Sequence, residues 1–357
     1  MKIIIAYASC GMGHRIAAEA LYDYIRENFK DKEVKIVDIL NCTTPLFSYL
    51  YRQGYSFLVQ YLRFIWALLY YLTLKNPYLR IFLNFLCYLN SRSFINYLLS
   101  ERPDIVLNTH FFPLEIASRI KNKLGFRLIT VITDFGVHPF WVNYNCDDYI
   151  VGSEYTLKQL NREGIPREKI KIFGIPLRKD FLVRYERKKE GFSVLILTGS
   201  FGFSLIEKIV EMLSFKINLY VVCGNNQRLH LRLKKKKYNK VRLFGFTNEI
   251  AKIMSEVDLV ITKPGGLGIV EALAMDLPML FIDGIPGQET LNAKVLESYG
   301  CGIRLKRLKE IKDLVLDLKK DSNRIDLMRK NVIKFKKPNA TQEICNYVCS
   351  GSLRTPS

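Results

Sequence analysis

The chain has 357 residues, of which 49% are hydrophobic, so it can build two packed cores and is not a disordered chain. Its formal net charge is +20, from 54 Lys and Arg against 34 Asp and Glu. Residues 1–150 hold 16 basic and 12 acidic residues, a net of +4, which leaves 38 and 22, a net of +16, for residues 151–357. Surfaces this basic attract nucleic acid or acidic lipid, although a lysine run such as residues 232–237 is also typical of a solvated helix face.

The cysteines point to a reducing compartment. They form no CxxC pair and no His/Cys cluster at zinc spacing, so we expect reduced packing residues, no metal site and a cytosolic setting. The eight positions are Cys10, Cys42, Cys87, Cys146, Cys223, Cys301, Cys345 and Cys349.

The first predicted elements are a buried strand over residues 3–8 and an amphipathic helix after it. The apolar run is short and ends in glycines, which is typical of a strand rather than a signal peptide. His14 follows Gly11 and Gly13 at the start of the helix, where backbone N–H groups are unpaired. A histidine there suits acid/base chemistry, and the alternative is a capping or packing role.

Residues 39–100 contain no Asp or Glu and are crowded with aromatic and aliphatic side chains. Residues 57–74 approach the length of a membrane span, but Arg63 within them would cost about 3 kcal/mol at the bilayer centre. We therefore predict helices or loops that lie in the membrane interface, with Trp66 at headgroup depth and Arg52 and Arg63 at the phosphates. The alternative is an ordinary buried helix pair.

Further strands of the first domain are predicted over 34–37, 104–107, 128–132 and 149–151. His110 follows the 104–107 strand, and Asp134 and His138 follow the 128–132 strand. Because ligands bind at the carboxyl ends of parallel strands, these side chains are expected near His14. Their spacing does not favour a metal, so we predict acid/base and acceptor-positioning roles.

The strand–helix alternation starts again after Pro176. Strands are predicted over 194–197, 219–222, 241–244, 259–261 and 279–282. Two such series predict an α/β protein with two Rossmann-like domains, whose parallel sheets face each other across a cleft. The expected boundaries are a first domain over 1–177, a linker over 178–192, a second domain over 193–335 and a C-terminal helix over 336–357 that docks on either domain.

Three loops of the second domain carry polar chemistry. Residues 198–204 (TGSFGFS) include Ser200 and are a plausible phosphate cradle, and residues 262–266 (TKPGG) place a glycine pair at a helix start, which suits a diphosphate. Glu271 suits a ribose diol. The segment 286–289 (PGQE) ends in Gln288 and Glu289, a pair suited to sugar hydroxyls.

Five segments occur in the order found in one enzyme family. They are GMGHRIAAEAL at 11–21, TDFGVHPFWV at 133–142, FGIPLR at 173–178, TKPGG at 262–266 and PGQE at 286–289. Over roughly residues 1–320 the chain resembles the monogalactosyl- and glucosyl-diacylglycerol synthases, which are related to the lipid-linked GlcNAc transferase of peptidoglycan synthesis. The resemblance implies the GT-B fold, a UDP-hexose donor in the second domain and a diacylglycerol-like acceptor in the first. It also implies inversion at the anomeric carbon without a bound metal or other cofactor.

The resemblance also implies roles for single residues. His14 matches the proposed general base, with Asp134 and His138 as further catalytic candidates. Donor-binding roles fall to a larger set: Arg178, Ser200, Phe246, Lys263, Gly265, Gly266, Glu271, Gln288 and Glu289. Trp141 joins Arg52, Arg63 and Trp66 on the acceptor and membrane side. The chain departs from the family at residues 199–204, where the family often has a longer glycine-rich loop.

The expected function is therefore hexose transfer from a UDP-sugar to a lipid by a peripheral enzyme at the cytoplasmic face of an anionic membrane. The alternatives are GlcNAc transfer to a polyprenyl-linked cell-wall precursor, a UDP-sugar epimerase and a non-catalytic sensor of UDP-sugar and lipid. Residues 133–141 and 286–289 favour the diacylglycerol enzymes, and the acid-free 39–100 stretch disfavours a soluble substrate. Nucleic-acid binding lacks a recognised module and is not expected.

Overall fold

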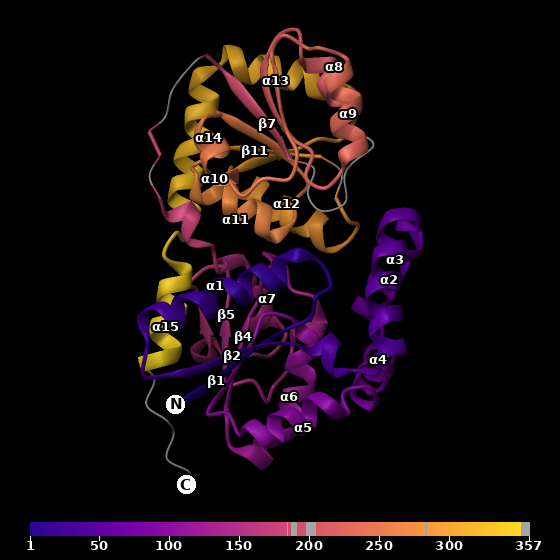
Figure 1. Ribbon diagram of the computed structural model, residues 1–357, viewed down its shortest axis with the longest axis vertical. Coiled ribbons are helices and arrows are strands. Elements are labelled where there is room, and N and C mark those ends of the chain that lie inside the picture. Colours follow the sequence, from indigo (N-terminus) through magenta and orange to yellow (C-terminus); the bar gives the residue numbers. More distant parts are fainter. Residues whose placement is uncertain (184, 187–190, 198–204, 283, 351–357) are drawn as a thin grey trace. The chain divides into compact units, whose positions relative to one another are not determined.

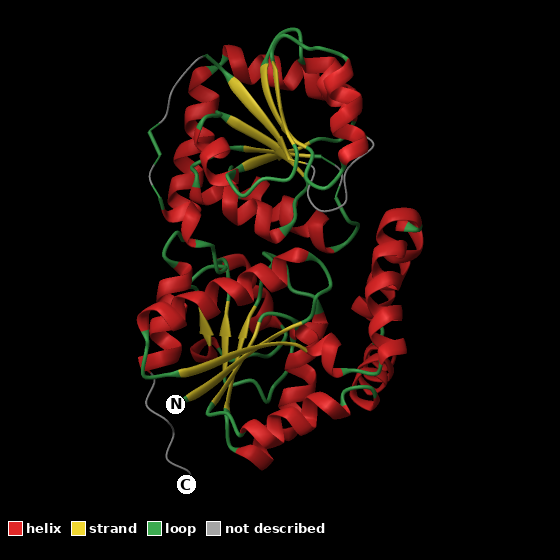
Figure 2. Ribbon diagram, in the orientation of Figure 1, coloured by secondary structure: helices red, strands yellow, loops and turns green. Residues whose placement is uncertain are grey.

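The computed structural model describes residues 1–183, 185–186, 191–197, 205–282 and 284–350 (Figure 1). The chain forms two compact units. The first contains Met1–Arg178, Ile285–Gln288 and the residues from Lys337 on, and the second contains Lys179–Gly284 and Glu289–Lys336. Each unit is a six-stranded parallel sheet flanked by helices (Figure 2), so the predicted α/β class is confirmed.

The sheet of the first unit has the strand order β2-β1-β3-β4-β5-β6, and all of its pairs are parallel. The bounds are β1 (Lys2–Tyr7), β2 (Glu33–Asp38), β3 (Ile105–Asn108), β4 (Arg127–Val131), β5 (Asp148–Ile150) and β6 (Ile170–Lys171). The five predicted strands are confirmed, and only the two-residue β6 was not predicted. Because β1, β3 and β4 are neighbours and run the same way, the loops that follow them meet at one edge of the sheet.

Alternating side chains of this sheet face two helical layers. Ile3 and Ile5 pack with α1 (Met12–Asn28) and α15 (Ala340–Ser350) on one face. Ile4 and Ala6 point to the other face. That second layer consists of α5 (Arg92–Glu101), α6 (Phe111–Leu124) and α7 (Glu154–Arg162).

The C-terminal helix α15 is part of the first unit. The Thr341 hydroxyl accepts a hydrogen bond from Leu177 N and donates one to Leu177 O, both 2.8 Å long, in a buried setting. Tyr347 donates to Asp148 Oδ1 at 2.7 Å, and the Arg127 guanidinium lies 4.8 Å from the centre of its ring. The chain thus returns to the first sheet after forming the second.

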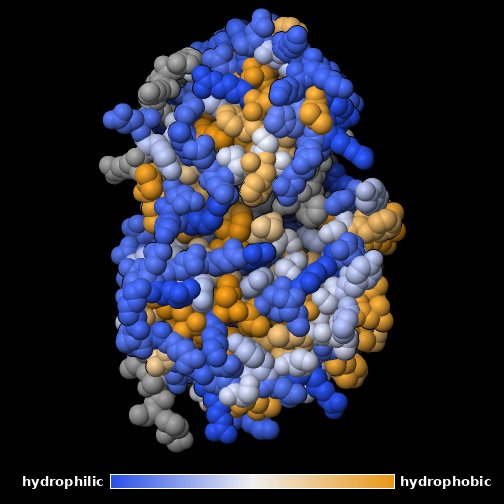
Figure 3. Space-filling model, viewed as in Figure 1, coloured by the Kyte–Doolittle hydropathy of each residue, from blue (hydrophilic) through white to orange (hydrophobic). Residues whose placement is uncertain are grey.

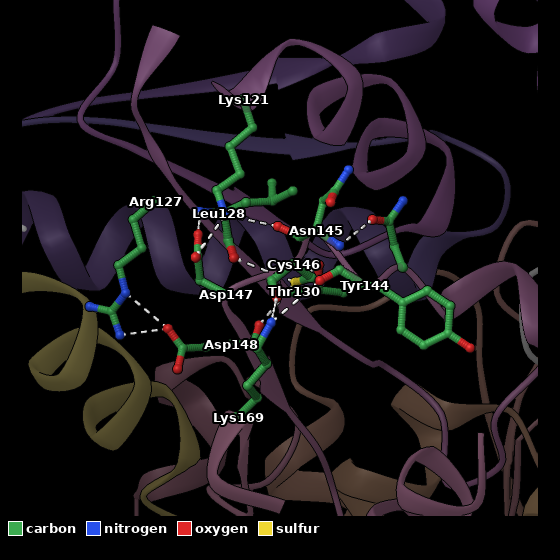
Figure 4. Close-up of polar contacts among 11 residues, drawn as sticks. Lys121, Arg127, Leu128, Thr130, Tyr144, Asn145, Cys146, Asp147, Asp148 and Lys169 are labelled. Carbon is green, nitrogen blue, oxygen red and sulfur yellow. Dashed lines mark hydrogen bonds and ion pairs between the residues drawn. The ribbon is translucent and has the colours of Figure 1, made fainter. Parts of the chain in front are cut away.

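A polar network holds the amino ends of β4 and β5 (Figure 4). Asp147 accepts from Lys121 Nζ at 2.7 Å and from Leu128 N at 2.8 Å. Arg127 donates twice to Asp148 Oδ2, at 2.7 and 2.9 Å. These ion pairs lie at the edge opposite the carboxyl-end loops, so they stabilise the sheet and leave the other edge for chemistry.

Residues 45–89 form an arm of three helices beside the first sheet (Figure 1), consisting of α2 (Pro45–Tyr61), α3 (Arg63–Lys75) and α4 (Pro77–Leu89). Its exposed large side chains are Leu46, Tyr49, Leu50, Phe57, Tyr61, Leu62, Phe64, Ile65, Leu68, Leu69, Tyr71, Leu72, Tyr78, Ile81, Phe82, Phe85, Leu86 and Leu89. Figure 3 shows this hydrophobic surface along the arm. The exposure contradicts the alternative of a buried helix pair.

No single helix among the described residues has the length and apolar composition to cross a membrane. Helices α2 and α3 together meet those two criteria, but the chain bends by 115° between them.

The second unit has the strand order β12-β11-β10-β7-β8-β9, again all parallel. The strands are β7 (Ser193–Leu197), β8 (Asn218–Val222), β9 (Val241–Phe244), β10 (Leu259–Thr262), β11 (Met279–Phe281) and β12 (Gly302–Arg304). The helices are α8 (Ile206–Leu213), α9 (Gln227–Lys235), α10 (Ile250–Ser255), α11 (Gly266–Ala274), α12 (Gln288–Ser298), α13 (Ile311–Lys320) and α14 (Ser322–Phe335). The five predicted strands are confirmed, and β12 is a short addition at the sheet edge.

Short 3-10 turns complete the connections in both units. They are η1 (Ile39–Cys42), η2 (Pro139–Trp141), η3 (Arg167–Lys169), η4 (Lys179–Leu182) and η5 (Leu308–Glu310).

We expect Thr341→Val to destabilise the first unit by about 1–3 kcal/mol, because a shape-conserving change leaves the buried N–H and C=O of Leu177 without their partner. Denaturant unfolding followed by circular dichroism measures the change. Thr290→Val, the same substitution at a half-buried position of α12, is the control. An equal loss of stability in both variants would contradict the role given to Thr341.

Candidate functional site

His14 is held in one orientation at the carboxyl end of β1. It is the third residue of α1, and the turn before the helix uses Gly11 at a φ of 89°, which favours glycine. His14 Nδ1 lies 2.9 Å from the Thr109 carbonyl oxygen and 2.8 Å from Thr133 Oγ1. A carbonyl oxygen only accepts, so Nδ1 carries the proton and donates it. The lone pair is therefore on Nε2, the arrangement that a general base requires.

Three strands contribute to this arrangement. Thr109 follows β3 and Thr133 lies just beyond β4, while His14 follows β1. Thr109 Oγ1 donates to the His14 carbonyl oxygen at 2.9 Å, and Thr109 N donates to Ala6 O at 3.1 Å. The ring is thus fixed to backbone that belongs to the sheet.

The electrostatic environment keeps His14 neutral. Burial lowers the pKa of His14, and the Asp134 carboxylate and the hydrogen bond to Thr109 oppose that shift without cancelling it. Asp134 is itself buried just after β4. The neutral imidazole with a fixed tautomer presents its Nε2 lone pair to a proton donor.

Aromatic rings surround the histidine. The His110 ring lies edge-on to His14 with centroids 4.6 Å apart, and Trp141 lies 6.2 Å from His14 and 6.3 Å from His110. Trp141 is buried, with 3% of its surface exposed. Its predicted place on the acceptor side is therefore next to His14, and it does not lie on an exposed membrane-facing surface.

His138 connects the arm to the loop after β4. Its Nδ1 accepts from Phe140 N at 3.3 Å, and its Nε2 lies 3.2 Å from Thr73 Oγ1 on α3. The Tyr70 ring lies 4.8 Å away. Burial is the main cause that lowers the pKa of His138 to about 4, and Arg80 adds to it. Both nitrogens have partners, so the geometry fits a positioning role, and the catalytic role of His138 stays a prediction.

Arg52 has two partners within the first unit. Its guanidinium donates to Asp38 Oδ2 at 2.9 Å and to Asn41 Oδ1 at 2.7 Å. Asp38 also accepts from Ser9 N in the turn before α1. Arg52 thus ties α2 to the end of β2 and, through Asp38, to the turn after β1. Its predicted contact with lipid phosphate stays a prediction.

The other predicted membrane residues lie on α3. Arg63 is the first residue of that helix. Trp66 packs edge-on against Tyr55 of α2, with ring centroids 5.2 Å apart, and is half-buried.

The β10–α11 loop of the second unit presents an anion-binding geometry. Gly266 begins α11, and Gly265 is its N-cap residue, which has no side chain to cap the helix. Gly265 N donates to the Lys263 carbonyl oxygen at 2.9 Å. Lys263 Nζ pairs with Glu289 Oε1 at 2.8 Å in a largely buried setting. A Cβ atom on Gly265 would lie 3.3 Å from that same Glu289 oxygen, so the glycine pair, Lys263 and Glu289 are neighbours. Glu271 is buried on α11.

The other residues predicted to bind the sugar donor lie in different parts of the chain. Phe246 is 72% exposed in the loop after β9, and Arg178 ends the main segment of the first unit. Gln288 belongs to the 285–288 segment of the first unit, and its amide donates to the Asp134 carboxylate. Ser200 lies outside the described residues.

The part of the chain that the structure describes contains no group of three His, Cys, Asp or Glu side chains placed to hold a metal ion.

A pH titration tests the environment of His138. We expect its imidazole to titrate near pH 4, because burial favours the neutral form. Since an unfolded histidine titrates near 6.5, the unfolded state binds more protons between about pH 6.5 and pH 4. The stability from His138 is therefore complete above that window and falls as the pH falls through it.

Proton NMR of the imidazole and denaturant unfolding at several pH values measure these effects. His138→Gln keeps a donor toward Thr73 and is expected to remove this part of the pH dependence. An NMR midpoint near 6.5 would contradict the described burial.

Comparison with known proteins identifies related families for both halves of the chain. The family model for monogalactosyldiacylglycerol (MGDG) synthase matches residues 14–177, and that for the glycosyltransferase family 28 C-terminal domain matches residues 193–344. The processive diacylglycerol beta-glucosyltransferase of Bacillus pumilus is 28% identical over 364 residues, which cover 96% of this chain and 93% of that protein. The Bacillus licheniformis protein of the same name is 29% identical, with the same coverage.

Solved structures show the same fold at low sequence identity. MurG of Acinetobacter baumannii has a TM-score of 0.66 at 15% identity, over 98% of this chain and 99% of that chain. Alr3699/HepE of Anabaena, solved in complex with UDP, has a TM-score of 0.58 at 14% identity, over 98% and 100%. The predicted GT-B fold class is confirmed. The chain is a glycosyltransferase of family 28 whose N-terminal half is the domain of the MGDG synthases.

Proposed function

We propose that this enzyme transfers a hexose from a UDP-hexose to the hydroxyl of a diacylglycerol-like lipid and so makes a glycolipid at a membrane surface. The observation that carries the proposal is the fixed tautomer of His14, whose Nε2 is left as the proton acceptor. The names of the relatives, diacylglycerol glucosyltransferases, support the acceptor class.

The reaction is a single displacement. His14 Nε2 takes the proton of the acceptor hydroxyl as its oxygen forms a bond to the anomeric carbon. The bond from that carbon to the diphosphate oxygen breaks on the opposite face, and UDP leaves with the electron pair. The anomeric configuration is therefore inverted, as expected for one displacement.

The leaving diphosphate gains negative charge, and the second unit offers groups that stabilise it. Helix α11 begins at Gly266, where the helix dipole favours an anion. Lys263 lies next to Gly265 and contributes a positive charge, part of which its ion pair with Glu289 offsets. Glu271 suits the ribose diol, and Gln288 with Glu289 suits the hexose. No metal or other cofactor is required in this scheme.

The arm is the surface that we assign to the membrane. Diacylglycerol does not leave a bilayer at useful concentration, so the enzyme must reach it there. The arm exposes aromatic and aliphatic side chains, carries no acidic residue and contains basic ones, a combination that fits an anionic interface at the cytoplasmic face.

A product assay tests the reaction. Purified protein is mixed with diacylglycerol in anionic liposomes and with radiolabelled UDP-glucose or UDP-galactose in parallel. We expect a labelled glycolipid from at least one donor. His14→Ala is expected to lower turnover by about 10²–10⁴, the contribution of a general base, while UDP binding by calorimetry is retained.

His230→Ala, a histidine on α9 of the second unit, is the matched control and should retain turnover. Near-normal turnover of the His14 variant would transfer the base role to Asp134 or His138. Absence of lipid product from both donors, despite UDP binding, would favour a polyprenyl-linked acceptor or a non-catalytic sensor.

A liposome assay tests the arm. Phe64 and Tyr78 are each 81% exposed. Each side chain contributes about 1.5–3 kcal/mol if fully buried, so we expect the pair Phe64→Ser and Tyr78→Ser to weaken binding to anionic liposomes at least tenfold. Phe215→Ser, at a position 79% exposed in the second unit, is the control. Co-sedimentation with liposomes measures binding at two salt concentrations, and we expect the higher concentration to weaken it. If the control variant loses as much liposome binding as the arm variant, the arm is not the membrane-binding surface.

A further inference from the structure

His110 is a buried polar group beside the base that the proposed mechanism does not use. It follows Thr109 at the end of β3 and is only 3% exposed. Its ring centroid lies 4.6 Å from that of His14, with an angle of 84° between the planes. It therefore belongs to the same edge of the sheet as the base.

Its protonation state follows from its contacts. His110 Nδ1 accepts a hydrogen bond from Phe112 N at 3.0 Å and so caps α6. Burial and the neighbouring His14 hold the pKa of His110 well below its ordinary value, so the ring is neutral. A neutral ring that accepts at Nδ1 carries its proton at Nε2. The two histidines thus have opposite tautomers, since His14 is protonated at Nδ1.

The N–H at His110 Nε2 has no acceptor among the described residues. This nitrogen is not among the fully buried polar atoms that lack a partner, so a molecule that enters the site can reach it. Aromatic rings of Phe111 and Trp141, with centroids 4.2 and 6.3 Å from that of His110, border it and offer no strong acceptor. A ligand oxygen beside the reacting hydroxyl would satisfy it.

We propose that His110 Nε2–H binds the ester carbonyl oxygen next to the reacting hydroxyl of the lipid acceptor. This inference rests on the proposed function, because it places that hydroxyl at His14 Nε2. A carbonyl oxygen only accepts and therefore matches a site that only donates. In diacylglycerol the nearest ester group is a few bonds from the free hydroxyl, a span comparable with the separation of the two rings. The aromatic border suits the adjoining acyl chain.

Two substitutions separate the two nitrogens of His110. The amide oxygen of Asn occupies a place similar to Nδ1, so His110→Asn keeps an acceptor for Phe112 N and removes the Nε2 donor. The amide nitrogen of Gln extends to a place similar to Nε2, so His110→Gln keeps the donor and removes the cap.

The experiment compares a diester acceptor with a dialkyl ether of the same chain length, which lacks the carbonyl oxygens. Both are presented in identical anionic liposomes with the UDP-hexose that supports turnover. We expect the wild type to prefer the diester in kcat/KM by about tenfold, the effect of one hydrogen bond. His110→Asn should lose this preference by slowing on the diester alone, and His110→Gln should retain most of it.

The outcomes distinguish the role of His110 from the proposed function on which it rests. A wild type that is active without preference for the diester overturns the role of His110 and leaves the proposed function intact. If His110→Asn retains the preference for the diester and His110→Gln loses it, the proposed role of Nε2–H is also overturned. The preference would then depend on the cap of α6 by Nδ1. A wild type inactive on both lipids overturns the proposed function and this inference together. Thermal unfolding of each variant confirms that it is folded.

Discussion

The hydrogen bond from His14 Nδ1 to the Thr109 carbonyl oxygen fixes the chemistry of the first unit. A free imidazole exchanges its proton between two nitrogens, and only one tautomer presents a lone pair to a substrate. Here a backbone carbonyl of the sheet selects that tautomer, and the Thr133 hydroxyl supports it. The backbone that holds the ring follows neighbouring parallel strands, so the position of the ring is a direct consequence of the strand order.

The sequence predicted most of the fold because its signals are local. Short apolar runs between amphipathic segments identify buried parallel strands, and ten of the twelve strands were predicted in this way. The two that were not predicted, β6 and β12, have only two and three residues. His14 was also predictable, since it follows two glycines at the end of a strand.

The partners of His14 could not be predicted in the same way. Thr109 acts through its carbonyl oxygen, and every residue has one, so the sequence holds no signal for it. Thr133 precedes Asp134 in a segment where the charged and aromatic residues are the stronger candidates for chemistry by residue type. The contacts of Arg52 with Asp38 and of His138 with Thr73 are long-range, so the sequence holds no signal for them either.

These two contacts also explain how the arm is connected to the site. Arg52 joins α2 to Asp38, which accepts from Ser9 N in the turn before α1, and His138 joins α3 to the loop that follows β4. The apolar arm is therefore attached at two points to the loops around His14. The surface that we assign to the membrane is in this way continuous with the backbone that orients His14.

The most direct test of the account is the position of the His14 proton. The chain has four histidines, so ¹⁵N-histidine labelling and long-range proton–nitrogen NMR at pH 7 resolve each ring, and His14→Ala assigns the signal. The account predicts a neutral His14 ring with its proton on Nδ1, opposite to His110. A proton on Nε2, or on both nitrogens, would contradict the assignment of His14 as the base.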